Sequence, residues 1–102
     1  MSFDYRIHET AYEEYIDAYG WYEIKSEGLG TRFMGCIEKR ILFILENPEY
    51  FSKRHGNFRE AKVEDFPYII VYEFFKRKRF IHISAIYHTR RNPRHRYRKR
   101  KR

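Results

Sequence analysis

Apolar residues recur along this chain with two different periods, and the periods divide it into strand-like and helix-like segments. Between residues 2 and 8, apolar and polar positions alternate, which is typical of a half-buried strand. From residue 10 the apolar positions recur at spacings of three and four, which predicts a helix with one apolar face. Thr10 followed by Glu13 predicts a capping box at its start. The buried face of this helix would be formed by Ala11, Tyr15, Ala18 and Tyr22.

A second helical pattern begins at about Thr31 and ends at Asn47-Pro48, because the residue before a proline disfavours helical dihedral angles. Only Gly28-Leu29-Gly30 separates the two helices, which predicts that they pair as an antiparallel hairpin. The buried stripe of the second helix would be formed by Phe33, Ile37, Ile41 and Leu45.

Three strand-like segments follow, over residues 58–64, 68–75 and 80–88. The middle one is apolar at successive positions, as expected of a central strand that is covered on both faces. The charged run Lys76–Arg79 predicts a hairpin loop before the last strand. Strict alternation in the last strand places on one face Ile81, Ile83, Ala85 and Tyr87. The order β-α-α-β-β-β predicts an α+β fold in which the helical hairpin packs on one face of a mainly antiparallel four-stranded sheet.

Length and cysteine content restrict the class of protein. A chain of 102 residues has room for one domain. Its single cysteine, Cys36, excludes a disulfide within the chain, so a reduced, cytoplasmic setting is the expectation. There is no signal-peptide pattern and no apolar run near the ~20 residues of a membrane span. The five histidines show no metal-ligand spacing, so we expect neither a metal nor another cofactor.

The net charge of +8 is concentrated at the C-terminus. Residues 90–102 hold seven Arg, two Lys and no acidic residue, whereas residues 1–89 hold 13 basic and 14 acidic residues. This distribution would attract polyanions to one end of the molecule. We expect a single domain over residues 1–93, followed by a flexible basic tail over residues 94–102. The tail could bind nucleic acid without sequence preference, steer the protein to an acidic partner, or only keep it soluble.

Several short strings occur in one order along the chain. They are Trp21-Tyr22, Gly28-Leu29-Gly30-x-Arg32-Phe33, Asn47-Pro48, Phe58-Arg59-x-Ala61-x-Val63, Phe66-Pro67-Tyr68-x-Ile70-x-Tyr72 and Ile83-x-Ala85-Ile86-x-His88-x-x-Arg91-Asn92-Pro93. In this order and spacing, on the β-α-α-β-β-β layout, the chain resembles the RelE/ParE superfamily, the toxins of bacterial type II toxin–antitoxin systems. The resemblance runs from about Tyr5 to Pro93.

The resemblance implies a cytoplasmic toxin of the plasmid-stabilisation type, which a cognate antitoxin neutralises in a hetero-oligomer. RelE-like members cleave mRNA in the ribosomal A site, and ParE-like members poison DNA gyrase. The His88-x-x-Arg91-Asn92-Pro93 ending and the Phe66-Pro67-Tyr68 string look more ParE-like. Inhibition of gyrase by binding, without catalysis, is therefore the leading hypothesis. A ribosome-dependent mRNA endonuclease is the alternative, and a non-toxic basic module that binds nucleic acid is a third hypothesis.

A metal-free ribonuclease needs a group that moves protons and cations that bind the phosphate. For the endonuclease hypothesis, the candidate catalytic residues are His88, Arg59 and Arg91. Lys62 is three positions from Arg59, so a regular strand would point these two side chains to opposite faces. Alternatively, the arginines and Lys62 are ordinary solvated surface charges, and His88 is a histidine at a strand end without a catalytic role.

For contact with gyrase or with nucleic acid, the candidates come from the start of the basic C-terminal end. They are Arg90, Arg91, Pro93, Arg94 and Arg96.

Overall fold

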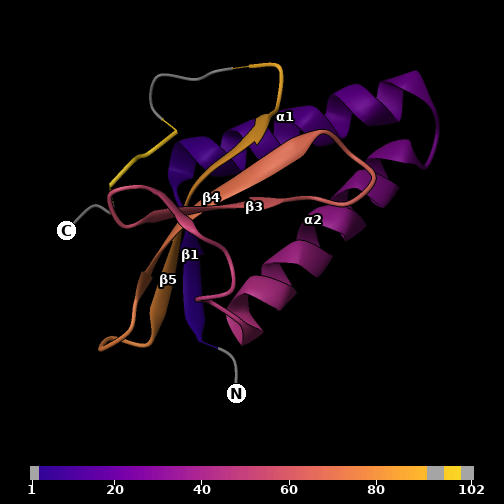
Figure 1. The fold of residues 1–102 in the computed structure, drawn as a ribbon. Coiled ribbons are helices and arrows are strands. Elements are labelled where there is room, and N and C mark those ends of the chain that lie inside the picture. The colour runs from indigo at the N-terminus through magenta and orange to yellow at the C-terminus, as the bar shows by residue number, and fades with distance from the viewer. Residues whose placement is uncertain (1–2, 92–95, 100–102) are drawn as a thin grey trace.

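The computed structural model describes residues 3–91 and 96–99, and its two helices pack on a five-stranded sheet (Figure 1). The elements in chain order are β1 (Asp4–Ile7), α1 (Glu9–Lys25), α2 (Leu29–Glu46), β2 (Lys53–His55), β3 (Phe58–Lys62), β4 (Tyr68–Phe75) and β5 (Phe80–His88). The strands lie side by side in the order β1-β5-β4-β3-β2. β1 pairs with β5 in parallel, and the other pairs are antiparallel. The predicted α+β fold is confirmed, and β4 is the central strand, as its apolar pattern predicts.

The sheet has one strand more than the four predicted. β2 is three residues long, and all of its side chains are exposed. It pairs with β3 across a turn in which Gly56 has a φ of 57°, a conformation that favours glycine. Because β2 has no apolar alternation, no strand pattern is visible in its sequence. Backbone pairing with the edge of β3 forms it.

The start of α1 also differs from the prediction. His8 is the N-cap, and its Nδ1 accepts the N–H of Thr10 at 3.1 Å, so the predicted capping box on Thr10 is wrong. The N–H of His8 donates to the carbonyl of Ile83 at 2.8 Å, which continues the pairing between β1 and β5 up to the first residue before the helix. Helix formation therefore starts where the strand ends, and an imidazole takes the role of the usual capping oxygen.

A carboxylate holds the turn between the helices. Glu23 accepts the N–H groups of Gly28 and Gly30 at 2.9 Å each, which satisfies donors that the start of α2 would leave unpaired. These bonds, that from Gly28 foremost, lower the pKa of Glu23. A Cβ on Gly30 would lie 2.6 Å from the carbonyl oxygen of Tyr19, so the missing side chain lets α1 and α2 approach closely. The predicted antiparallel hairpin is confirmed (Figure 1).

The main core lies between the helical hairpin and one face of the sheet. Tyr72 is fully buried at its centre, and its hydroxyl donates to the carbonyl of Pro48 at 2.8 Å. The α2 stripe predicted from the sequence is buried here. Other buried members of this core are Ile44, Ala61, Ile70, Ile81, Ile83 and Ile86.

A β-bulge interrupts β5. Val71 of β4 pairs with Ala85, whereas Tyr72 pairs with Ile83, so Ser84 is an extra residue on β5. The bulge shifts the phase of every later side chain, and Ala85 consequently faces away from the helices. The prediction that Ala85 and Ile83 share one face is therefore wrong. The β5 residues packed against the helices are Ile81, Ile83 and Ile86.

The face of the sheet away from the helices, called the far face below, carries a second and smaller core. Phe58, Val71 and Ala85 are buried there, and Tyr97 packs against them. Tyr97 belongs to the described stretch 96–99, drawn in yellow in Figure 1. Part of the segment expected to be a flexible tail thus lies against the sheet. Residues 94, 95 and 100–102 of that segment lie outside the described residues.

Candidate functional site

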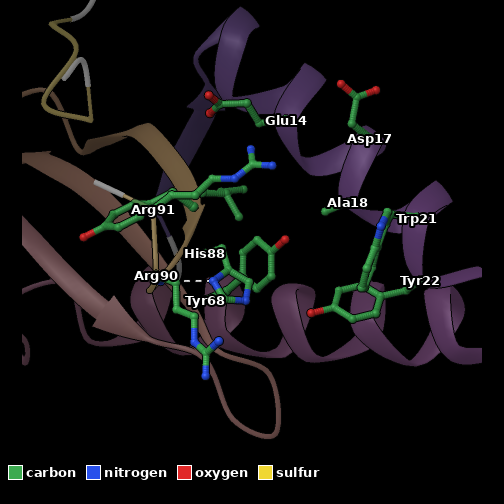
Figure 2. A pocket seen from close by; sticks show the side chains of 11 residues that line it. Glu14, Asp17, Ala18, Trp21, Tyr22, Tyr68, His88, Arg90 and Arg91 are labelled. Carbon is green, nitrogen blue, oxygen red and sulfur yellow. Dashed lines mark hydrogen bonds between the residues drawn. The ribbon is translucent and has the colours of Figure 1, made fainter. Parts of the chain in front are cut away.

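A cleft of about 720 Å³ lies between α1 and the end of β5 (Figure 2). One wall is a row of α1 side chains, namely Glu14, Asp17, Ala18, Trp21 and Tyr22. The opposite wall is formed by Tyr68 at the start of β4 and by residues at and after the end of β5, namely Ile86, Tyr87, His88, Arg90 and Arg91. Acidic and aromatic groups therefore face aromatic and basic ones across the cleft.

The short length of β1 explains why a cleft forms at this position. β1 pairs with β5 only from Phe80 to Ile83, and the chain then enters α1 at Glu9. Within the described residues, no strand continues along this edge of β5 beyond Ile83. α1 runs beside the second half of β5 in its place (Figure 1). Side chains of the helix and the strand line the space between them.

His88 fixes the turn that follows β5. Its Nδ1 accepts the N–H of Arg90 at 3.0 Å, and its carbonyl accepts the N–H of Arg91 at 2.9 Å (Figure 2). In the neutral form, an Nδ1 that accepts leaves the ring proton on Nε2. The ring meets that of Tyr68 edge to face, with centroids 5.3 Å apart. Burial raises the pKa of Tyr68, while the nearby Arg91 acts in the opposite direction.

Arg90 and Arg91 leave this turn in different directions. In Figure 2, Arg91 extends toward the wall formed by α1, whereas Arg90 extends away from it. Both side chains are exposed. Among the residues that the structure describes, neither of them forms an ion pair. A fixed turn thus presents two cations whose charge is available to a partner.

Arg59 does not join His88 and Arg91. It pairs with Tyr72 in the sheet, whereas His88 pairs with Tyr68, so the two positions differ by four residues along β4 and by two strands across it. Four residues of strand correspond to about 13 Å. The guanidinium of Arg59 donates to the carbonyl of Phe51 at 2.7 Å, which holds the segment before β2 against the sheet. The structure brings together only two of the three residues proposed for catalysis.

The remaining candidates lie elsewhere. Pro93 and Arg94 are outside the described residues. Arg96 lies on the far face, where its guanidinium is 4.7 Å from the ring centroid of Tyr97 and 5.9 Å from that of Tyr87. Lys62 is exposed, and it is out of phase along β3 with Arg59 and Ala61, which face the helices. The expectation that Arg59 and Lys62 point to opposite faces is met.

Two residues carry no recognisable sequence signal, namely Glu14 in the cleft and Ser84 on β5. Glu14 lies on the first helix among several other acidic residues, and only the tertiary structure places it at the cleft. Ser84 gains its position from the bulge. Trp21 is different, because the sequence itself shows that it lies off the apolar stripe of α1, which leaves contact with a partner open. It is 57% exposed, and Lys25 lies 5.0 Å above its ring.

Two further searches bear on chemistry and location. The described residues include no group of three or more His, Cys, Asp or Glu side chains arranged to hold a metal ion. Neither helix, as far as the structure describes the chain, has both the length and the apolar character needed to cross a membrane.

Comparisons with known proteins agree with this architecture. Residues 5–93 match the family model for the ParE toxin of the type II toxin–antitoxin system parDE. Among solved structures, the chain is similar to a free-state mutant of the E. coli toxin RelE, with a TM-score of 0.63 and 16% sequence identity over 88% of this chain and 86% of that one. At this identity the likeness shows the fold alone. No curated protein matches the sequence.

The family match covers nearly the whole described sheet and both helices, and the predicted resemblance to the RelE/ParE superfamily is confirmed. The chain therefore belongs to the ParE toxin family and is a toxin of a type II toxin–antitoxin system, whose partner is a cognate antitoxin.

Proposed function

We propose that this toxin inhibits DNA gyrase by binding it in the cytoplasm, without catalysis of its own. The contact surface begins at the turn after β5, with Arg90 and Arg91 beside the cleft, and continues into Pro93, Arg94 and the basic residues that follow. Gyrase trapped on DNA is a polyanionic assembly, and exposed arginines at one end of the toxin would be attracted to it.

The observation that carries this proposal is that Arg90 and Arg91 stand on a fixed turn with exposed, unpaired guanidinium groups among the described residues. Hydrogen bonds to His88 fix the backbone at Arg90 and Arg91, while both guanidinium groups remain exposed and without an ion pair among the described residues. Because the backbone there is already fixed, binding costs no backbone ordering at these two residues, and both guanidinium groups retain their full charge for a partner. The family match to ParE supports the same choice of target.

An mRNA endonuclease is the second candidate, and the pair formed by His88 and Arg91 in one cleft favours it. The third residue proposed for catalysis, Arg59, counts against the endonuclease hypothesis. It lies far along the sheet from the other two, and its guanidinium is bonded to the carbonyl of Phe51. A catalytic set needs groups within hydrogen-bond reach of one phosphate. We therefore rank endonuclease activity below gyrase inhibition.

Expression of the toxin without its antitoxin separates the two. If gyrase is the target, induced cells should show gyrase-linked DNA breaks and DNA-damage signalling while protein synthesis at first continues, and the purified toxin should inhibit supercoiling by purified gyrase. Rapid arrest of translation with cut mRNA would overturn the proposal in favour of the endonuclease. Normal growth, with the toxin folded and present, would favour a non-toxic module.

A double variant tests the surface itself. Arg90→Ala with Arg91→Ala should weaken inhibition of gyrase by at least about tenfold, since two charged contacts contribute about 1.4 kcal/mol or more. Arg77→Ala with Lys78→Ala is the matched control, because it removes the same charge from the exposed β4–β5 loop. Equal loss in both variants would show that net charge alone matters, and no loss in either would exclude this surface.

A further inference from the structure

The stretch Arg96–Lys99 lies beyond the part of the chain that matches the family, yet it is bonded to the sheet at the bulge of β5. The hydroxyl of Ser84 donates to the carbonyl of Arg96 at 2.7 Å and accepts the backbone N–H of Arg98. The guanidinium of Arg98 donates to the carbonyl of Ser84 at 3.1 Å. The bulged residue therefore binds this stretch at three points.

A carboxylate on α1 holds the same arginine. Nη1 and Nη2 of Arg98 lie 3.3 and 3.2 Å from the two carboxylate oxygens of Glu14. The Arg98 side chain is 13% exposed, against 61% for Arg32 in a surface ion pair. Arg98 thus occupies the edge of β5 just beyond the end of β1, where α1 and the strand lie side by side.

Acidic groups also lie beneath the neighbouring residues of the stretch. The hydroxyl of Tyr97 donates to Glu60, and its ring stacks on that of His55 with centroids 4.5 Å apart and a 12° angle. Burial raises the pKa of Glu73, and the positive charge of Lys99 acts in the opposite direction. Tyr97 and Arg98 are therefore each bonded to a carboxylate on the body of the protein, whereas Lys99 is exposed.

We propose that Arg96–Lys99 is a strap that docks on the far face and so keeps its basic residues from binding polyanions until a polyanion displaces it. In the docked state Glu14 neutralises Arg98, and the guanidinium of Arg96 lies over the rings of Tyr87 and Tyr97. Most of the contact is polar and charged, and only Tyr97 buries an apolar ring. Phosphates of a nucleic acid compete directly for such cations, and their binding releases counterions. Strap docking and binding of nucleic acid are then mutually exclusive.

The proposal does not depend on gyrase being the target, and two variants of the full chain test it. Glu14→Gln removes the charge that faces Arg98. Glu13→Gln is its matched control, because this neighbouring carboxylate is exposed and, among the described residues, forms no hydrogen bond or ion pair with the strap. Ser84→Ala removes the hydroxyl at the bulge without changing the charge. Circular dichroism confirms that each variant is folded.

Two readouts are needed. Amide hydrogen exchange of Arg98, followed by NMR, should be about tenfold faster in Glu14→Gln and Ser84→Ala than in Glu13→Gln and the unmodified protein, which corresponds to about 1.4 kcal/mol. Affinity for a fluorescent single-stranded 20-nucleotide DNA at low salt, measured by anisotropy, should rise several-fold in the same two variants. Addition of this DNA to the unmodified protein should remove the protection of the Arg98 amide.

Any of four results would overturn the proposal. The first is unchanged exchange at Arg98 in both strap variants. The second is faster exchange with unchanged affinity for the DNA, which would mean that the strap only stabilises the fold and does not hinder binding of nucleic acid. The third is a protected Arg98 amide in the saturated complex with DNA. Equal gains in Glu14→Gln and Glu13→Gln, with none in Ser84→Ala, would show that only the net charge acts.

Discussion

The guanidinium of Arg98 donates to both carboxylate oxygens of Glu14, although the two residues are 84 positions apart in the chain. The bond connects the stretch after β5 to the second turn of α1, across the edge of β5 that β1 leaves open. One side chain thereby joins three parts of the fold, and the carboxylate that it occupies also lines the cleft. Docking of the strap consequently neutralises a carboxylate of the cleft, and release of the strap leaves that carboxylate unpaired by Arg98.

A double-mutant cycle should measure this ion pair. Glu14→Gln, Arg98→Gln and the double variant are compared by urea denaturation, and we expect a coupling free energy of about 1 kcal/mol. A geometry in which both carboxylate oxygens accept strengthens the pair, whereas the exposure of Glu14, 35% of its side chain, screens it. The same cycle with Glu13 and Arg98 should give a coupling near zero. A coupling as small for Glu14 as for Glu13 would mean that the pair adds nothing to stability.

Gly30 and Gly35 of α2 should respond to alanine in opposite directions. Gly30→Ala places a methyl group 2.6 Å from the carbonyl oxygen of Tyr19, so the helices must separate, and we expect a loss of about 1 to 3 kcal/mol. Apart from the two chain neighbours of Gly35 and the backbone of its own helix, no atom of the described residues lies within 4 Å of a new Cβ, so Gly35→Ala should gain about 0.5 to 1 kcal/mol from helix propensity. Urea denaturation of both variants measures whether the free energy of unfolding falls or rises in each. A tolerated Gly30→Ala would contradict the close approach of the helices.

Arg59 is predicted to act on stability and not on toxicity. Arg59→Gln removes the bond to the carbonyl of Phe51, which should cost about 1 to 2 kcal/mol of the free energy of unfolding. Toxicity should fall only in proportion to the amount of folded protein in the cell. Arg54→Gln, at an exposed position on β2, is the control for the loss of charge. A stable Arg59→Gln protein that has lost all toxicity would favour the endonuclease hypothesis.

Two buried tyrosines should make the fold sensitive to alkali. Burial raises the pKa of Tyr72 and of Tyr15 from 10.0 to about 12. The unfolded chain releases these protons from about pH 10, while the folded protein holds them until about pH 12. Stability from this source is therefore complete below pH 10 and is lost as the pH rises to 12, by about 2 to 3 kcal/mol for each residue.

The variant Tyr72→Phe checks the sign of this effect. At pH 7 it should be about 1 kcal/mol less stable than the unmodified protein, because the bond to the carbonyl of Pro48 is lost. Above pH 10 the difference should shrink and then reverse, since phenylalanine has no proton to release. Urea denaturation at a series of pH values measures the difference in the free energy of unfolding between the two proteins. A difference that stays constant up to pH 12 would contradict the raised pKa of Tyr72.

Local periodicity determined much of this fold. The α2 stripe around Phe33 and Ile37, the hairpin turn at Gly28 and the central position of β4 were all readable in the chain. Each depends on burial that repeats at the period of its own element, and such a pattern is complete within one short segment. The order of the strings around these elements also carried the family resemblance, which the match over residues 5–93 confirms.

Only the tertiary structure decided the features that depend on a neighbour distant in sequence. β2 forms because the edge of β3 accepts it, and the bulge at Ser84 depends on the register with β4. The cleft depends on where β1 stops beside β5. Glu14, Ser84 and Arg98 meet because three separate segments reach the same edge. Sequence periodicity reports which side chains are buried, but not which distant partner a polar group finds, since that is set by how the elements pack together.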